Sequence, residues 1–509
     1  MYYQLSGKIK RITMSEIRVT YSGLIGLLIG LSTVVSGFIF ILIITRSLTP
    51  NELGTWGIIG GLLTYVIILE PIISYWTTRE IARDVDSGKT AILSSGIFSI
   101  IGILAFILIA YVVSGPIGVS TDILFFTALM IPFTFLNRTL SAIALGSKPH
   151  VNSYGVMVFD IAKIPAALIF VYFMELGIFG AILSLTVAYI PSNIVLGILL
   201  KNKLQNNFNK VFLKNWLKRA WLPSYIKFPN LVVLDVLVFS LITGSVVGLS
   251  YWIAASAIGT VVRHSGQITR AVYPKLLSGG HKEILQENLV RLFYFAFLFL
   301  AISIAFAKPA LFILNPIYDI AVLVVIFLTF RSLVKMIGTA FTQALQGIEK
   351  VDTKESTSKE YVKSKLFYLP SIRLIRRGIY LSILAIGLFI LVQSNSSQID
   401  LVIYWSFLVL VVEIPFTIYY YYLIRKYFPL SLDIFAIIKY LTISVFVFGG
   451  IYFLMEEFLE YEPSIFKFLL NLIPFLFLGC LSYFGLTYVV DKKTRKLFKM
   501  VLSEIKKKK

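Results

Sequence analysis

Residues 21–45 read YSGLIGLLIGLSTVVSGFIFILIIT and contain no charged side chain. A helix needs roughly 20 apolar residues to cross the hydrocarbon core of a bilayer, so this stretch is long enough to span one. A non-helical backbone exposed to lipid would leave its amide groups without hydrogen-bond partners. The stretch therefore predicts a membrane-spanning helix.

The rest of the chain has the same character. Of the 509 residues, 58% are hydrophobic and only 14% are charged, whereas about 25% of the residues in a soluble domain are charged. A soluble fold cannot bury so many apolar side chains, because its surface must be covered by polar groups. Long continuous apolar runs also exclude a transmembrane β-barrel, whose strands are short and alternating. We therefore expect a polytopic helical membrane protein and exclude an ordinary soluble enzyme.

Apolar runs of spanning length recur along the chain, and we place fourteen helices. They lie near residues 21–45, 54–76, 91–114, 122–145, 155–175, 177–200, 225–243, 246–264, 290–307, 315–345, 366–392, 399–424, 434–455 and 464–490. An even number of spans puts both chain ends on the same side of the membrane.

Lysine and arginine residues test this count and orient the chain. They gather after even-numbered helices, for example in 201–219, and in the tail Lys506–Lys509. The opposite side offers mainly Arg46 and Lys308 and carries the acidic loop 456–462. Cytoplasmic loops of membrane proteins are rich in lysine and arginine. We therefore expect a multi-pass protein of the plasma membrane with both termini in the cytoplasm and no cleavable signal.

Weak internal similarity appears at a separation near 190 residues. Leu53–Trp56 opens the second helix and Val247–Trp252 opens the eighth, while Asn137–Leu140 resembles Phe330–Leu333. A competing pairing of Leu145-Gly146 with Gln346-Gly347 leaves the register of the second match open. A six-span repeat keeps its orientation, as in transporters built from parallel repeats. The predicted fold is all-α, with two six-helix lobes related by an axis along the membrane normal and two extra C-terminal helices.

This repeat divides the chain into segments. We expect a cytoplasmic N-terminal segment (1–20), an N-lobe (21–200), a cytoplasmic linker (201–224), a C-lobe (225–424), helices 13 and 14 (434–490) and a basic cytoplasmic tail (491–509).

Few side chains are suited to hold a metal ion or a cofactor. Cys480 is the only cysteine, and His150, His264 and His281 are scattered along the chain. We therefore expect no metal site and no cofactor. The formal net charge of +21 is explained by the cytoplasmic basic residues of a multispanning protein, so we expect no nucleic acid partner.

Short motifs along nearly the whole chain resemble one family. Arg46–Trp56 (RSLTPNELGTW) resembles the signature A-R-x-L-G-P-E-E-F-G-L-Y that follows the first helix of Wzx-type polysaccharide flippases. Thr78–Arg83 (TREIAR) resembles the family's I-R-E-I-A-R. Asp235 with Val247-Gly248 and Tyr251 resembles D…G-x-x-x-V-G-x-Y, and Tyr273–Leu276 (YPKL) resembles L-P-x-L. In this chain Thr49 stands where the family usually has glycine, and Gly248 is followed by Leu-Ser-Tyr rather than by one residue and Tyr.

These flippases belong to the multidrug/oligosaccharidyl-lipid/polysaccharide exporter (MOP) superfamily. The resemblance implies a flippase, not an enzyme. Its substrate would be an isoprenoid (pyro)phosphate-linked oligosaccharide. The flippase would carry it from the cytoplasmic to the outer leaflet by alternating access, for surface polysaccharide or glycoprotein assembly. The implied partners are this lipid-linked oligosaccharide, membrane lipids and glycosyltransferases of the same pathway, and we expect a monomer.

An anionic substrate of this kind needs cations in the cleft between the lobes. A charge within a spanning helix is costly and normally faces a cavity or a partner. Arg331 and Lys335 lie one turn apart on the tenth helix and are the best candidates. Further candidates are Arg138, Arg46, Arg79 and Arg270. The structural alternatives are a pair of Arg331 with Glu413, a pair of Arg46 with Glu52, snorkelling of Arg138 to the surface, and plain topology charges for Arg79 and Arg270.

Acidic residues within the predicted spans are candidates for ion coupling. Asp235, Glu413 and Glu70 are the residues that we consider, and no one of them is preferred. Asp160 and Lys163 lie three residues apart and predict an ion pair within one helix. Glu70-Pro71 predicts a kink in the second helix, because proline leaves a carbonyl group without its helical donor.

Two other functions stay open. A MATE-like ion-coupled exporter of small molecules needs acids that dominate the cleft, whereas cations in the middle of helices are at least as numerous here. A polytopic glycan polymerase, ligase or glycosyltransferase needs catalytic residues on substantial outer loops, and the predicted outer loops are short.

Overall fold

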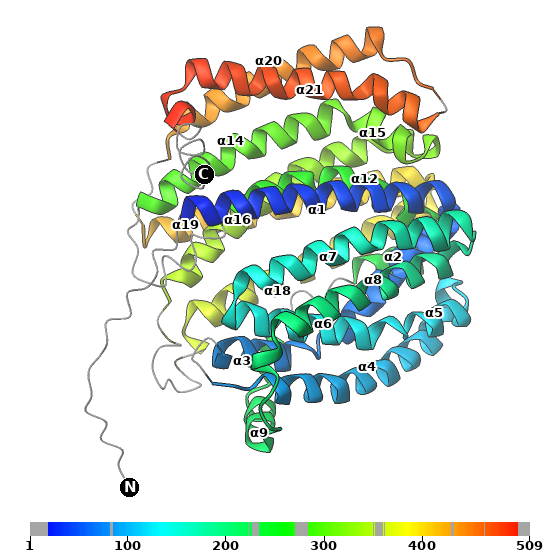
Figure 1. Ribbon diagram of the computed structural model, residues 1–509. Coiled ribbons are helices and arrows are strands. Elements are labelled where there is room, and N and C mark those ends of the chain that lie inside the picture. The colour runs from blue at the N-terminus through cyan, green and yellow to red at the C-terminus, as the bar shows by residue number, and fades with distance from the viewer. Residues whose placement is uncertain are drawn as a thin grey trace.

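The computed structural model describes residues 19–81, 85–221, 223–225, 234–269, 283–349, 351, 360, 362–428, 432–462 and 464–496. Within these ranges the regular secondary structure is helical, without a strand. Most helices run side by side along one direction (Figure 1). We call the end at which α1 begins and α21 ends the basic end, since it is the end predicted to be cytoplasmic, and we call the opposite end the far end.

The first eight helices pack largely on one another. They are α1 (Val19–Ser47), α2 (Pro50–Ile67), α3 (Pro71–Ile81), α4 (Gly88–Ile117), α5 (Thr121–Thr127), α6 (Met130–Ser147), α7 (Pro149–Ala167) with the π-helical turn η1 (Leu168–Phe173), and α8 (Gly177–Leu199). Helix α6 contacts α3, α4 and α8, and α7 lies along α8 and α1.

A second group follows after the short helices η2 (Lys201–Lys203) and α9 (Lys210–Lys218). It consists of α11 (Asp235–Thr243), α12 (Val247–Gly259), η3 (Val261–Thr269), α14 (Glu283–Ala305), α15 (Ala307–Leu314), η4 (Pro316–Ala321), α16 (Val322–Gly347), α18 (Lys365–Gln393) and α19 (Gln398–Arg425). Helix α16 packs on α19 and α12, and α18 packs on α11 and α19.

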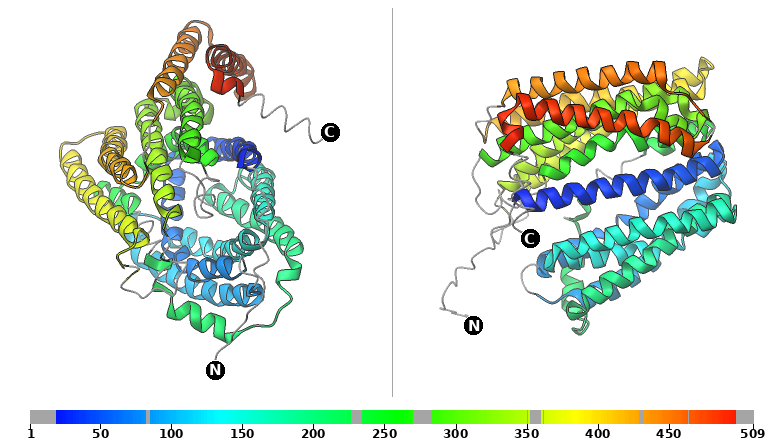
Figure 2. Two further views of the ribbon diagram at one scale, coloured as in Figure 1. Left: turned by 90° about the vertical axis from the view of Figure 1, so that its left-hand side faces the viewer. Right: turned by 45° about the horizontal axis from the view of Figure 1, so that its top comes forward.

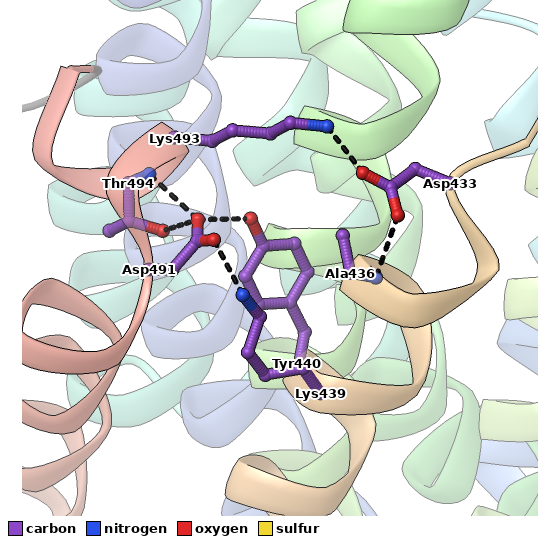
Figure 3. Close-up of polar contacts among 7 residues, drawn as sticks. All are labelled: Asp433, Ala436, Lys439, Tyr440, Asp491, Lys493 and Thr494. Carbon is purple, nitrogen blue, oxygen red and sulfur yellow. Dashed lines mark hydrogen bonds and ion pairs between the residues drawn. The ribbon is translucent and has the colours of Figure 1, made fainter.

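The last two helices, α20 (Ile434–Phe458) and α21 (Ile465–Val490), form an antiparallel pair at the edge of the bundle (Figure 2). Helix α20 lies against α14 and α21 against α20. At the basic end Asp491 joins the two helices (Figure 3). It accepts hydrogen bonds from Lys439 Nζ at 2.6 Å and from the Tyr440 hydroxyl at 2.7 Å, and also from the amide and hydroxyl groups of Thr494.

Ten helices in the described residues are long and apolar enough to cross a membrane, or eleven if the bent pair α2 and α3 counts as one span. The protein is therefore a multi-pass membrane protein, but the predicted number of fourteen is not confirmed. The other predicted spans are those at 21–45, 225–243 and 246–264. Of these, 225–243 is partly outside the described residues, and α12 covers only thirteen residues of 246–264.

The predicted kink at Glu70-Pro71 is confirmed. Helices α2 and α3 meet there at an angle of 59°, and Pro71 is the first residue of α3. Two short helices lie between the predicted spans. The linker 201–224 contains the amphipathic helix α9, and α15 lies between the predicted spans 290–307 and 315–345. Both helices are too short to register as spans.

The two groups meet where α2 packs on α12 and where α1 packs on η3. A β-carbon built on Gly54 would lie 2.0 Å from the carbonyl oxygen of Val246, so the two backbones approach as closely as only glycine permits. Residues 53–56 and 247–252, which the internal similarity pairs, therefore lie on helices that touch at this interface. The symmetry axis between the two lobes stays a prediction.

Candidate functional site

Helix α16 carries two cations within its apolar length. Lys335 lies about 18 Å and Arg331 about 24 Å from the end of α16 at Gly347, at 1.5 Å per residue. Their spacing of four residues puts both side chains on one face of the helix. Neither side chain makes a hydrogen bond or ion pair within the part of the chain that the structure describes, and Nε of Arg331 is buried. The two cations are therefore available to an anion.

Helix α18 brings two arginines to the same depth. Arg376 lies about 16 Å from the start of α18, at 1.5 Å per residue. It forms an ion pair with Glu413 of α19, whose residue is only 6% exposed. The neighbouring Arg377 lies 3.7 Å (Nη1 to Oδ2) from Asp235 of α11. Both carboxylates of this region are thus neutralised by α18.

A hydrogen-bonded chain holds Asp235 in place. The hydroxyl group of Tyr380 donates to Asp235 Oδ2 at 3.1 Å and accepts from Trp405 Nε1 at 2.5 Å. The Trp405 ring stacks on Trp252, with 3.9 Å between ring centroids. The chain ties α11, α12, α18 and α19 together, so the ion pair is built into the packing of the second group.

The four cations, Tyr380 and Glu413 line one small cavity of about 20 Å³. We call it the cationic pocket; it is lined by Arg331, Lys335, Arg376, Arg377, Tyr380, Val409, Val412 and Glu413. Two of its four cations are matched by Glu413 and Asp235, and two, Arg331 and Lys335, have no ion-pair partner among the residues that the structure describes. In a low-dielectric surrounding an unmatched positive charge attracts an anion strongly.

The structure thus brings together four of the residues that the sequence singled out: Arg331, Lys335, Asp235 and Glu413. The alternative pairing of Arg331 with Glu413 was wrong, because Arg376 holds that carboxylate. Sequence reasoning missed Arg376 and Arg377. The signal was present in the predicted span 366–392, where arginines at 373, 376 and 377 follow the i, i+3, i+4 spacing of one helix face.

The other candidate cations lie elsewhere. Arg46 donates hydrogen bonds to the carbonyl groups of Phe312 and Ile313 at the end of α15. The alternative pairing of Arg46 with Glu52 was wrong, because Glu52 closes a capping box with Thr49 at the start of α2. Arg46 therefore belongs to the far end of the bundle and not to the cationic pocket.

Arg79 lies in the last turn of α3 and donates to the hydroxyl group of Tyr75 at 2.7 Å. Arg138 is exposed on α6 and makes no hydrogen bond or ion pair with any residue that the structure describes. Arg270 lies outside the described residues. Neither Arg79 nor Arg138 lines the cationic pocket.

Two of the acidic residues considered from the sequence, Glu70 and Asp160, lie in the first group of helices. Glu70 is buried at the break between α2 and α3 and accepts a hydrogen bond from Ser74 at 3.1 Å. The predicted ion pair of Asp160 and Lys163 is confirmed at 2.6 Å, and both residues are buried. Asp160 is thus matched within its own helix.

Comparison with solved structures finds the same fold in membrane transporters. An inward-facing multidrug resistance MATE family transporter of the MOP superfamily superposes with a TM-score of 0.56 at 14% identity, over 80% of this chain and 98% of that chain. Lipid II flippase MurJ in an inward closed conformation superposes with a TM-score of 0.59 at 13% identity, over 92% of this chain and 98% of that chain.

A third similar structure is a MOP superfamily transporter from Pyrococcus furiosus, for which a reversed polarity of the binding pocket suggests a different function. It superposes with a TM-score of 0.52 at 13% identity, over 80% of this chain and 95% of that chain. No protein-family model and no curated protein sequence matches the chain. Identities this low show the fold and not the Wzx-type subfamily. The chain therefore has the helical fold of the MOP superfamily transporters.

Proposed function

We propose that this protein is a flippase that moves an isoprenoid (pyro)phosphate-linked oligosaccharide from the cytoplasmic to the outer leaflet by alternating access. The observation that carries the proposal is the cationic pocket, in which Arg331 and Lys335 lie well inside the apolar helix α16 and have no ion-pair partner in the described parts of the chain. A phosphate or pyrophosphate group supplies the missing negative charge. Arginine also suits it geometrically, since the planar guanidinium can bind two phosphate oxygens at once.

The charge balance separates this function from export of small organic cations. A pocket for a cation needs an available carboxylate, but Glu413 and Asp235 are both held by arginines of α18. An added cation would have to displace an arginine and would then face Arg331 and Lys335 at close range. Like charges repel strongly where little water screens them. The pocket therefore favours an anionic cargo.

The comparisons support this proposal through the fold. The similarity to MurJ, a lipid II flippase, extends over 92% of this chain, whereas the similarity to the MATE transporter extends over 80%. Both folds support a transporter and not an enzyme. A MATE-like exporter of small molecules is therefore the competing function that an experiment must exclude.

The test uses the purified full-length protein reconstituted in vesicles with a fluorescent polyprenyl-pyrophosphate-linked disaccharide. The variant Arg331→Ala/Lys335→Ala removes both unmatched cations and should abolish flipping while membrane insertion stays normal. The matched control is Arg331→Lys/Lys335→Arg, which keeps both charges and should keep most of the activity. Normal flipping by the alanine variant would refute the pocket assignment. Uptake of a fluorescent organic cation by the wild-type protein, without flipping of the lipid, would favour the MATE-like alternative.

A further inference from the structure

A set of hydrogen bonds at the far end of the bundle lies outside the cationic pocket. The last turn of α1 meets the last turn of α15, which lies about 270 residues further along the chain. Thr45 Oγ1 lies 3.0 Å from the carbonyl oxygen of Leu314 and 2.8 Å from that of Ile41 in its own helix, and the two oxygens share its single proton. Arg46 donates to the carbonyl oxygens of Ile313 and Phe312, both at 2.9 Å. Asn315 Nδ2 donates back to the carbonyl oxygen of Thr45 at 3.1 Å.

The contact pairs the unpaired carbonyl groups at the end of α15 with the hydrogen-bond donors of Arg46. The last carbonyl groups of a helix have no donor within the helix, and they carry the negative end of its dipole. The Arg46 guanidinium supplies two donors and a positive charge at that point. Hydrogen bonds to a charged group are roughly twice as strong as those between neutral groups. Arg46 thus connects the helix that starts the first group to a helix that belongs to the second.

A second contact closes the same end. Gly54, near the start of α2, lies against the backbone at Val246, immediately before α12. Helices α2 and α12 are separated by almost 200 residues along the chain, yet their far-end turns approach as closely as a glycine allows. The cationic pocket lies deeper, since Arg331 is about 14 Å from the start of α16, at 1.5 Å per residue. The two groups are therefore in direct contact at the far end, beyond the pocket.

We propose that Thr45 and Arg46 of α1 together with Phe312–Asn315 form a latch that holds the far end closed and releases when the two groups part during transport. The latch joins a cation to neutral carbonyl groups, with no carboxylate in the contact. Its members lie at the end of the bundle, and Arg46 is only half-buried, so water can replace each hydrogen bond on opening. Such a contact stabilises the closed end, and breaking it costs little free energy because water can replace the lost hydrogen bonds. Arg46 then acts on the conformation and has no need to touch the cargo.

This inference rests on the proposed function only in assuming that the groups move apart at the far end. The test therefore reads access to the pocket and not transport. A cysteine at Val412, an uncharged residue that lines the cationic pocket, serves as the reporter in a Cys480→Ser background, which removes the only native cysteine. An impermeant maleimide is added from the side of the α20–α21 loop, and the rate of labelling is measured in the full-length protein in vesicles.

Arg46→Ala should raise this labelling rate roughly tenfold, the factor that corresponds to 1.4 kcal/mol, and Arg46→Lys should raise it less. The matched control is Lys308→Ala. Lys308 is a cation of α15, the helix whose carbonyl groups Arg46 binds, but its ammonium group lies over the ring of Tyr461 and takes no part in the latch. Labelling of Arg46→Ala at the wild-type rate would overturn the latch. An equal rise in Lys308→Ala would overturn it as well, since the effect would then be one of surface charge.

A double-cysteine variant tests the latch independently if Arg46→Ala fails to fold. Thr45→Cys/Asn315→Cys in the same background should form a disulfide on oxidation and reduce labelling of the pocket from the far side, with recovery on reduction. A pair that oxidises without changing the labelling would contradict the latch. A labelling pattern as expected, with no flipping of the lipid-linked disaccharide, would support the latch and refute the flippase.

Discussion

The close approach of α2 and α12 makes Gly54→Ala a sharp perturbation. A β-carbon at Gly54 would lie 2.0 Å from the carbonyl oxygen and 3.0 Å from the β-carbon of Val246. Favourable contacts between carbon atoms lie near ~3.5–4.0 Å, so the helices must separate by more than about 1 Å. Overpacking of this kind costs about 1–3 kcal/mol. At Gly60, on the same helix, a β-carbon would meet nothing within 4 Å.

Gly60→Ala is therefore the matched control. Alanine in a helix is favoured over glycine by about 1 kcal/mol, so this variant should be slightly more stable than the wild type. Gly54→Ala has the same intrinsic gain but an added packing cost, and we expect the two variants to differ by about 1–3 kcal/mol. Thermal unfolding of the purified proteins in one detergent measures the difference. Equal midpoints for both variants would show that the two backbones do not touch as described.

Three further predictions test other parts of the structure. Asp160→Asn should destabilise the protein by about 3–5 kcal/mol in thermal unfolding, because it leaves the buried Lys163 without its partner. The double variant Asp160→Asn/Lys163→Met should recover most of this loss. A double variant as unstable as the single one would contradict the prediction. Burial raises the pKa of Asp491, but hydrogen bonds from Lys439, Tyr440 and Thr494 outweigh it and lower the pKa to about 2. Because this pKa is below the ordinary value, the contact contributes about 2 kcal/mol to the free energy of unfolding above pH ~4, and this contribution is lost as the pH falls toward 2. Asp491→Asn should remove this pH dependence of thermal unfolding. An unchanged pH profile in the variant would contradict the prediction. Cysteines placed in 456–462 should react with an impermeant reagent from outside intact cells, whereas labelling only after lysis would reverse the predicted orientation.

Local features of the structure were predictable from the sequence. The thickness of the bilayer sets the length of an apolar run, so most spans lie where the runs lie. The kink at Glu70-Pro71 and the Asp160–Lys163 pair were predictable for a similar reason, since both depend on residues within one or two helical turns. The shared face of Arg331 and Lys335 also follows from their spacing alone.

The partners of these residues depended on the tertiary structure. Nothing in the order of residues assigns Glu413 to Arg376 instead of Arg331, because the choice is made by how α16, α18 and α19 pack. Arg46 is a further case. Its neighbour in sequence is Glu52, but its donors reach carbonyl groups about 270 residues away.

The sequence by itself thus determined that the chain crosses a membrane as apolar helices and carries cations within them, because burial in lipid constrains each segment separately. Which cations are neutralised and which stay unmatched was decided only by tertiary packing. The reason is that a charge in a helix is matched by a group on another helix, and the distance between the two is set by the whole bundle.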